Sequence, residues 1–288
     1  MATAILLALT LIALPGCSVV RLGYGHIDSF AVWTADEYFD LDPQQRHEFN
    51  SRFERLHEWH RYEQLPEYAA FLAETKARLQ RKLTREDLNW FVDGLKARYR
   101  TIVRRGAPDA AALLATIRPE QLDALRRQFD KDNRKFVREY RLDASPEEIE
   151  RARIRRALSQ IKDWVGSLTV EQEQMVIAMT KSAPVIYRLR HEDRLRRQRE
   201  FLRLMESRAE REAFTARLRH WLLNWEEGRA PEYDRLLAEW WGKRVEMLLA
   251  LDRMLTPHQR AAAAHRLQNY IADFTRLAER PAAATASR

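Results

Sequence analysis

The segment HEWHRYE contains the side chains best suited to metal chemistry, His57, His60 and Glu63. They recur at i, i+3 spacing, which places them on one face of a predicted helix. Two imidazoles and one carboxylate can ligate zinc. A zinc protease, however, carries His-Glu-x-x-His with its histidines at i, i+4, and this segment is one residue short of that spacing. We therefore predict no metal site and expect structural or surface histidines near a helix end. A metal-dependent hydrolase is the alternative.

Cys17 is the only cysteine of the 288 residues, and it follows an apolar run from Ala2 to Leu14. As a helix this run would span roughly 20 Å, too short for a bilayer of about 30 Å but suited to a secretory signal. The next residues, Leu14-Pro15-Gly16-Cys17, resemble a bacterial lipobox. The resemblance implies cleavage between Gly16 and Cys17 and a diacylglyceryl group on the cysteine. The alternative is a buried cysteine on an N-terminal core helix.

A lipid on Cys17 would place the protein in the cell envelope. One acyl chain binds a membrane marginally, whereas two or more anchor a protein stably. With no second cysteine the mature chain can form no internal disulfide. In enterobacterial lipoproteins an aspartate after the cysteine resembles an inner-membrane retention signal. Ser18 occupies that position here, so we expect an outer-membrane protein that faces the periplasm.

The composition predicts an all-α protein. Charged residues make up 32% of the chain, and Gly plus Pro amount to only 8 + 10 = 18 residues. No sustained alternation of apolar and polar residues indicates a strand. We expect an elongated bundle of about ten helices. The expected parts are a signal over 1–16, an acidic and aromatic lead-in over 17–42, a helical domain over 43–280 with a subdivision point near 144 or 183, and a disordered tail over 281–288.

The net charge of +8 comes from a chain rich in arginine. The arginines cluster in 151–156 and 188–199, where acidic residues are interleaved or adjacent. This pattern favours solvated helix faces with internal ion pairs. The alternative is a basic face for anionic lipid, an envelope polymer or an acidic partner protein. Nucleic acid is not an expected partner, because the predicted signal leads out of the cytosol and no nucleic-acid-binding motif is present. A cytosolic nucleic-acid binder is the alternative only if the N-terminus is not a signal. The partner-binding candidates are Arg188, Arg190, Arg194, Arg196, Arg197 and Arg199.

A recurring five-residue phrase predicts helix starts. Its copies are LDPQQ at Leu41, LTRED at Leu83, IRPEQ at Ile117, ASPEE at Ala144, LTVEQ at Leu168 and LTPHQ at Leu255. A capping side chain, often a proline after it, and an acid or glutamine three residues beyond the cap together fit a capping box. Arg118 is a poor cap, so IRPEQ could instead be a proline kink. The phrases resemble the Leu-Thr-x-x-Gln motif of small periplasmic helical chaperones and stress adaptors, which makes such a role an alternative to ordinary capping.

The segments LGYGHIDSFAVWTADEYFDLDPQQR and LHEWHRYEQLPEYAAFL, between Leu22 and Leu72, resemble a proteobacterial lipoprotein family of unknown function. The resemblance implies a lipid anchor and an all-helical periplasmic body, but no activity. The matching positions in the first segment are Leu22, Gly23, Tyr24, Asp28, Trp33, Asp36, Tyr38, Asp40, Leu41, Asp42 and Pro43. Those in the second are Trp59, His60, Arg61, Glu63, Leu65, Pro66 and Tyr68.

No catalytic constellation is predicted. The chain has no Gly-rich phosphate loop and no Gly-x-Ser-x-Gly elbow, and an acylated Cys17 cannot act as a nucleophile. We therefore expect neither an enzyme nor a cofactor. The predicted role is non-catalytic binding or scaffolding in the bacterial envelope.

Overall fold

The computed structural model describes residues 17–280, and this part of the chain folds into helices without a strand. The all-α prediction is confirmed. The predicted signal over 1–16 and the predicted tail over 281–288 lie outside the described residues. The helices are α2 (Cys17–Gly25), α3 (Ile27–Phe39), α4 (Pro43–Trp59), the π-helical turn η1 (His60–Gln64), α5 (Leu65–Leu79), α6 (Arg85–Leu114), α7 (Pro119–Tyr140), α8 (Pro146–Val165), α9 (Val170–Ser182), α10 (Tyr187–Glu206), α11 (Arg211–Leu223), α12 (Pro231–Met254) and α13 (Pro257–Ala278).

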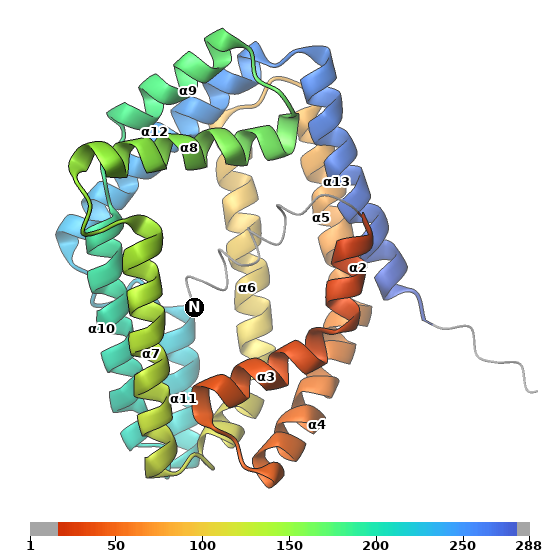
Figure 1. Cartoon of the computed structure of the whole chain (residues 1–288). Helices are drawn as coiled ribbons and strands as arrows, with labels where there is room; N and C mark the ends of the chain where they lie inside the picture. The colour runs from red at the N-terminus through yellow and green to blue at the C-terminus, as the bar shows by residue number, and fades with distance from the viewer. Residues whose placement is uncertain (1–16, 281–288) are drawn as a thin grey trace, which may run out of the picture.

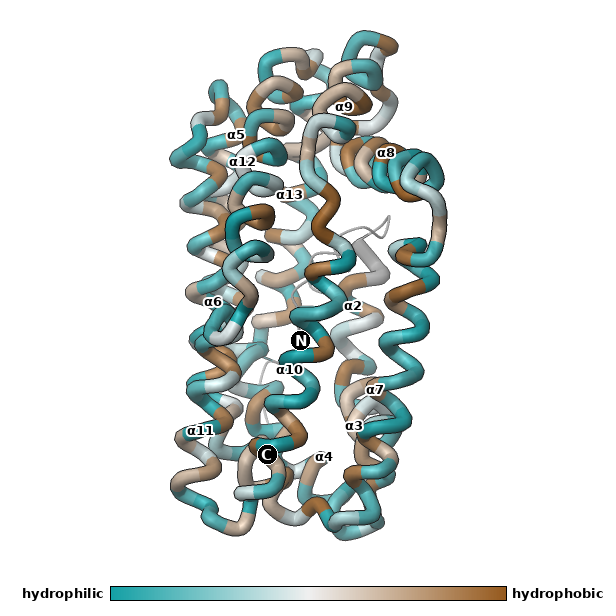
Figure 2. Tube along the Cα trace, turned by 90° about the vertical axis from the view of Figure 1, so that its left-hand side faces the viewer, coloured by the Kyte–Doolittle hydropathy of each residue, from teal (hydrophilic) through white to brown (hydrophobic). Residues whose placement is uncertain are grey.

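The helices form an elongated frame (Figure 1). Helices α5 and α13 pack along each other on one side, and α7 packs beside α10 on the other side. Helices α8, α9 and α12 meet at one end of the frame, whereas α3 and α4 lie at the opposite end. Teal and brown residues alternate along the helices (Figure 2), as expected of amphipathic helices that each bury one stripe. Within residues 17–280 no helix combines the length and the apolar character needed to cross a bilayer.

Two main hydrophobic cores hold the frame together. The first core draws on α6, α7, α10 and α11, and its most buried members include Leu125, Met205 and Phe214. The second core joins α8, α9, α12 and α13 around Val176 and Met247. Each core combines residues from distant parts of the sequence. The predicted subdivision points near 144 and 183 fall in connections between helices. The first core contains residues from before and after both points, and the second core contains residues from before and after 183.

Four of the recurring phrases meet in pairs through buried glutamines. The side-chain amides of Gln45 and Gln121 hydrogen-bond each other in both directions at 2.7 and 3.1 Å. Those of Gln172 and Gln259 do the same at 2.8 Å. Each amide oxygen also accepts the N–H of its own N-cap residue. Each amide nitrogen also donates to the carbonyl two residues before its partner's N-cap. All four buried amides are therefore fully hydrogen-bonded, as buried polar groups require.

The phrase at Ile117 starts a helix and is not a proline kink. The backbone of Arg118 is extended, and α7 begins at Pro119. The Arg118 N–H donates to the side-chain oxygen of Gln121 at 2.9 Å. Arginine has no acceptor, so the cap uses only this half of the capping box. The hydrogen bonds between Gln121 and Gln45 also fix the start of α7 against the start of α4.

Gly94 on α6 is required by the ring of Phe71. A Cβ atom at Gly94 would overlap that ring, approaching Cζ to 2.6 Å. The ring is buried and also contacts Trp90 and Phe91, with centroid distances of 4.8 and 5.4 Å, so a shift of the ring would disturb packed neighbours. We expect Gly94→Ala to lower the free energy of unfolding by about 1–3 kcal/mol. Chemical denaturation measures this effect.

Gly242 on α12 provides the control, because a Cβ atom added to it would meet no neighbouring atom within 4 Å. Gly242→Ala should raise the free energy of unfolding by up to about 1 kcal/mol, since alanine favours a helix over glycine. Equal stabilisation by both substitutions would contradict the close approach at Gly94.

Candidate functional site

Helices α2 and α3 are held to the body by a cluster of aromatic, histidine and aspartate side chains. We call it the N-terminal docking site, and its members are Tyr24, Asp28, His57, His60 and Tyr68. The Tyr24 hydroxyl lies 2.9 Å from His60 Nδ1, and Asp28 Oδ1 lies 2.9 Å from His57 Nδ1. The Tyr24 ring lies against both imidazoles, with centroids at 4.7 and 5.9 Å. Tyr68 meets the His60 ring edge-on at 5.3 Å. The site thus joins α2 and α3 to α4, η1 and α5.

A π-helical turn carries His60. Pro66 has no N–H and its ring would crowd the carbonyl four residues earlier, at Tyr62, in a regular α-helix. The chain widens into η1 here, and the Leu65 N–H donates to the His60 carbonyl. Such π-bulges often occur at functional sites. In this protein the bulge lies within the Trp-His-Arg-x-Glu-x-Leu-Pro segment, and it brings His60 against Tyr24.

Burial keeps three side chains of the docking site neutral: His60, Tyr24 and Tyr68. Burial, followed by the neighbouring His57, lowers the pKa of His60 to about 4. Burial also raises the pKa of Tyr68 to about 12 and moves the pKa of Tyr24 well above its ordinary value. His60 is therefore a neutral imidazole near pH 7. Its Nδ1 can accept a hydrogen bond from the Tyr24 hydroxyl.

Two further contacts fix the N-terminal helices. Arg21 on α2 forms an ion pair with the buried Asp273 on α13 at 3.1 Å. Burial raises the pKa of Asp273, so this pairing offsets part of the cost of burying the carboxylate. On α3, the Tyr38 hydroxyl donates to the Asp132 carboxylate on α7. Helix α2, whose first residue is Cys17, is therefore held to the body a few residues after that cysteine.

The three metal-site candidates do not form one cluster in the structure. His57 and His60 lie together, but they contact Asp28 and Tyr24. Glu63 is exposed and takes no part in the docking site. Within the described residues, no three His, Cys, Asp or Glu side chains are grouped as metal ligands would be. Sequence reasoning found both histidines but not their partners on α2 and α3.

Most of the candidate arginines on α10 contact other parts of the fold. Arg194 donates to Asn133 on α7 at 2.8 Å. Arg196 donates to the Glu227 carbonyl at 2.6 Å and also pairs with Asp193 and Glu200 on its own helix. Arg197 stacks on Trp221 at 3.8 Å. Arg190 lies over the Tyr140 ring of α7, and Arg188 donates to the Leu142 carbonyl at 3.4 Å. Arg188 and Arg199 are both exposed. That these arginines bind a partner stays a prediction.

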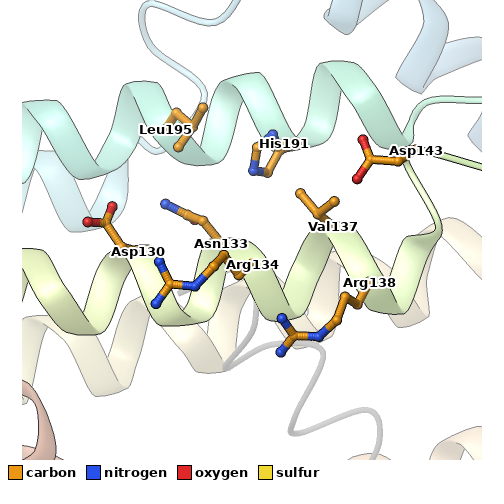
Figure 3. Close-up of a pocket in the computed structure, with 8 residues that line it drawn as sticks. All are labelled: Asp130, Asn133, Arg134, Val137, Arg138, Asp143, His191 and Leu195. Atoms are coloured by element: carbon orange, nitrogen blue, oxygen red, sulfur yellow. The ribbon is translucent and has the colours of Figure 1, made fainter.

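A shallow, open groove of about 460 Å³ separates α7 from α10 (Figure 3). Arg134 and Arg138 lie on one of its sides, and His191 faces them from α10. Asp130 and Asp143 also line the groove, so its charges nearly balance. The groove therefore indicates no preference for an anion or a cation. The sequence offered no signal for it, because it depends on how two distant helices pack.

Acidification should weaken the docking site. His60 has a pKa of about 4 in the folded chain, against an ordinary value of 6.5. As the pH falls from 6.5 to 4 the unfolded chain takes up a proton that the folded chain excludes, so the stability conferred by neutral His60 is progressively lost. The loss should reach up to about 3 kcal/mol.

Chemical denaturation at pH 7 and pH 4.5 measures this loss, and His60→Gln provides the comparison. Glutamine can still accept from Tyr24 but does not titrate. The variant should show a smaller decrease between the two pH values than the wild type. Identical pH dependence of the two proteins would contradict the assignment to His60.

The comparisons with known proteins point to a single family. No curated protein and no solved structure matches the chain. Residues 37–234 match the model of a Family of unknown function (DUF6279), a range that includes the YFDLDP segment and the π-helical turn. This match covers more than half of the 288 residues. The chain therefore belongs to the Family of unknown function (DUF6279).

Proposed function

We propose that this protein is a lipoprotein of the bacterial envelope, acylated on Cys17 after cleavage behind Gly16. The sequence Leu14-Pro15-Gly16-Cys17 after a short apolar run is the observation that carries the proposal. The docking of α2 supports it, because Arg21 and Tyr24 tie this helix to the body close to Cys17. A lipid there would attach the membrane directly to the helical frame.

The helical body would then act as a non-catalytic binding or scaffolding module that faces the periplasm. Ser18 favours the outer membrane. The net charge of +8 suits an anionic polymer, an anionic lipid or an acidic envelope protein as a partner. Arg188 and Arg199, both exposed on α10, are the candidates best placed for such contact.

Replacement of the cysteine tests the anchor. We expect a palmitate analogue to label the wild type and the label to disappear in Cys17→Ala. Without acyl chains the variant is not stably anchored. It should therefore be missing from the membrane fraction as a mature protein and accumulate as a soluble or unprocessed chain. Metabolic labelling combined with membrane fractionation measures both effects.

Ser18→Ala serves as the matched control, because it changes the adjacent residue and keeps the thiol. It should remain labelled and membrane-bound. An unlabelled wild type found in the cytosol would refute the proposal and favour the alternative, a cysteine in the protein core.

A further inference from the structure

Large apolar side chains are exposed on the two helices that follow Cys17. Leu22 on α2 and Phe30 and Trp33 on α3 expose 66%, 56% and 57% of their surface. The Phe30 and Trp33 rings lie 5.8 Å apart and form one aromatic pair. We call these three residues the apolar patch. Elsewhere in residues 20–280, where side-chain exposure is described, the large apolar side chains with comparable exposure are Val170 and Val185, far along the chain.

The chain segment that carries the apolar patch contains almost no charged residue. Between Leu22 and Trp33 the only Asp, Glu, Lys or Arg is Asp28, and its carboxylate pairs with His57 at 2.9 Å. Charged residues make up 32% of the whole chain. Exposed apolar side chains on a segment with one charged residue, two of them large aromatic rings, suit an apolar neighbour better than water. Aromatic side chains of this kind are favoured at the boundary between lipid headgroups and acyl chains.

The fold brings this surface close to Cys17. Leu22 follows Cys17 on the same helix, about 8 Å along its axis at 1.5 Å per residue. Helix α3 begins directly after His26. Helices α2 and α3 lie on the same side of the frame, the side that faces the reader in Figure 1. Because α2 is tied down through Arg21 and Tyr24, no flexible linker separates the patch from Cys17.

We propose that the apolar patch inserts into the lipid bilayer, so that α2 and α3 lie in the membrane interface. This inference rests on the proposed function, since acylation of Cys17 would hold these helices at the bilayer. A bilayer is favoured over a second copy of the chain because the patch adjoins the proposed lipid attachment. Insertion of uncharged side chains needs no anionic headgroups, so it should occur in phosphatidylcholine vesicles and persist in high salt.

The experiment places a fluorescent probe on the patch. Because Cys17 is the only native cysteine, an added cysteine is the only reactive thiol in the acylated protein. Trp33→Cys and Phe30→Cys report on the patch, and both side chains are exposed, so neither change removes a core contact. Val170→Cys is the control, because its side chain is 65% exposed on α9 at the other end of the frame. Each full-length variant is purified from membranes, labelled with the nitrobenzoxadiazole fluorophore and reconstituted into phosphatidylcholine vesicles.

Vesicles with brominated acyl chains should quench the probe at residues 30 and 33 by about twofold or more and leave the probe at residue 170 unchanged. Equal, unquenched emission at all three positions would overturn the inference. Probe self-quenching that rises with protein density, without quenching by brominated lipid, would assign the patch to a second copy and also overturn it. Acylation of Cys17, measured in the same preparations, separates the two claims. If Cys17 is acylated but the probes are not quenched, membrane insertion of the apolar patch is refuted and the lipid anchor stands. If Cys17 is not acylated, the proposed function itself is refuted.

Discussion

Replacement of Gln172 by alanine should lower the free energy of unfolding by about 3 kcal/mol, because a buried hydrogen-bonded pair is broken on one side. Gln172 is 1% exposed, and its amide exchanges two 2.8 Å hydrogen bonds with Gln259. Its loss leaves the Gln259 amide and the Met254 carbonyl short of a partner inside the protein. The Thr169 N–H also loses its acceptor, which removes part of the α9 cap. Chemical denaturation measures the change.

Two further variants isolate the hydrogen bonds from packing. Gln172→Met keeps a side chain of similar length but removes every amide contact, so it should cost nearly as much as alanine. Gln174→Ala changes an exposed glutamine of the same helix and should stay within about 0.5 kcal/mol of the wild type. A double replacement of Gln172 and Gln259 should cost less than the sum of the single ones, since both break the same contacts. Simple additivity would argue against the pairing.

Arg153→Met should also lower the free energy of unfolding by about 2–4 kcal/mol, because it removes a buried side chain and leaves the carbonyls at the end of α9 without their donor. The Arg153 side chain is buried and donates to the carbonyls of Thr180 at 2.9 Å and Ala183 at 2.7 Å. These groups end α9, where a helix has unpaired carbonyls and a partial negative charge. Burial lowers the pKa of Arg153, yet a guanidinium remains charged at neutral pH.

Arg153→Lys separates charge from geometry. An ammonium group retains the charge but lacks the planar fork of the guanidinium, so lysine should recover only part of the loss. Arg155→Met is the control, because Arg155 is exposed on the same helix and should change stability by less than about 0.5 kcal/mol. Equal losses at residues 153 and 155 would contradict a specific role in ending α9. Denaturation followed by circular dichroism distinguishes these outcomes.

The sequence predicted helix starts well, because capping is a local property. Asp42, Thr84, Ser145, Thr169 and Thr256 cap the helices that the recurring phrases predicted. The pairing of the phrases was not predictable in the same way. Gln45 meets Gln121 and Gln172 meets Gln259 across long sequence separations, and a buried glutamine looks the same in sequence as an exposed one. The buried pairs explain these phrases by structure alone, and similarity to the Leu-Thr-x-x-Gln proteins stays a prediction.

The partners of the arginines could also be predicted only in part. Interleaved acids led us to expect solvated ion pairs, which Arg196 forms with Asp193 and Glu200. Arg153 and Arg197 instead donate to backbone carbonyls near the ends of other helices. A carbonyl is present at every residue, so the sequence does not indicate which carbonyl an arginine will contact.

The docking site shows the same difficulty. The sequence motif identified His57 and His60, but not their partners Tyr24 and Asp28 on the preceding helices.

The most direct test of the envelope-lipoprotein proposal is the mass of the N-terminal peptide from protein extracted with detergent from membranes. The proposal predicts a peptide that begins at Cys17 and carries a diacylglyceryl group on sulfur, with or without a third acyl chain on the new amine. A peptide that continues through residues 1–16 with an unmodified Cys17 thiol would contradict it.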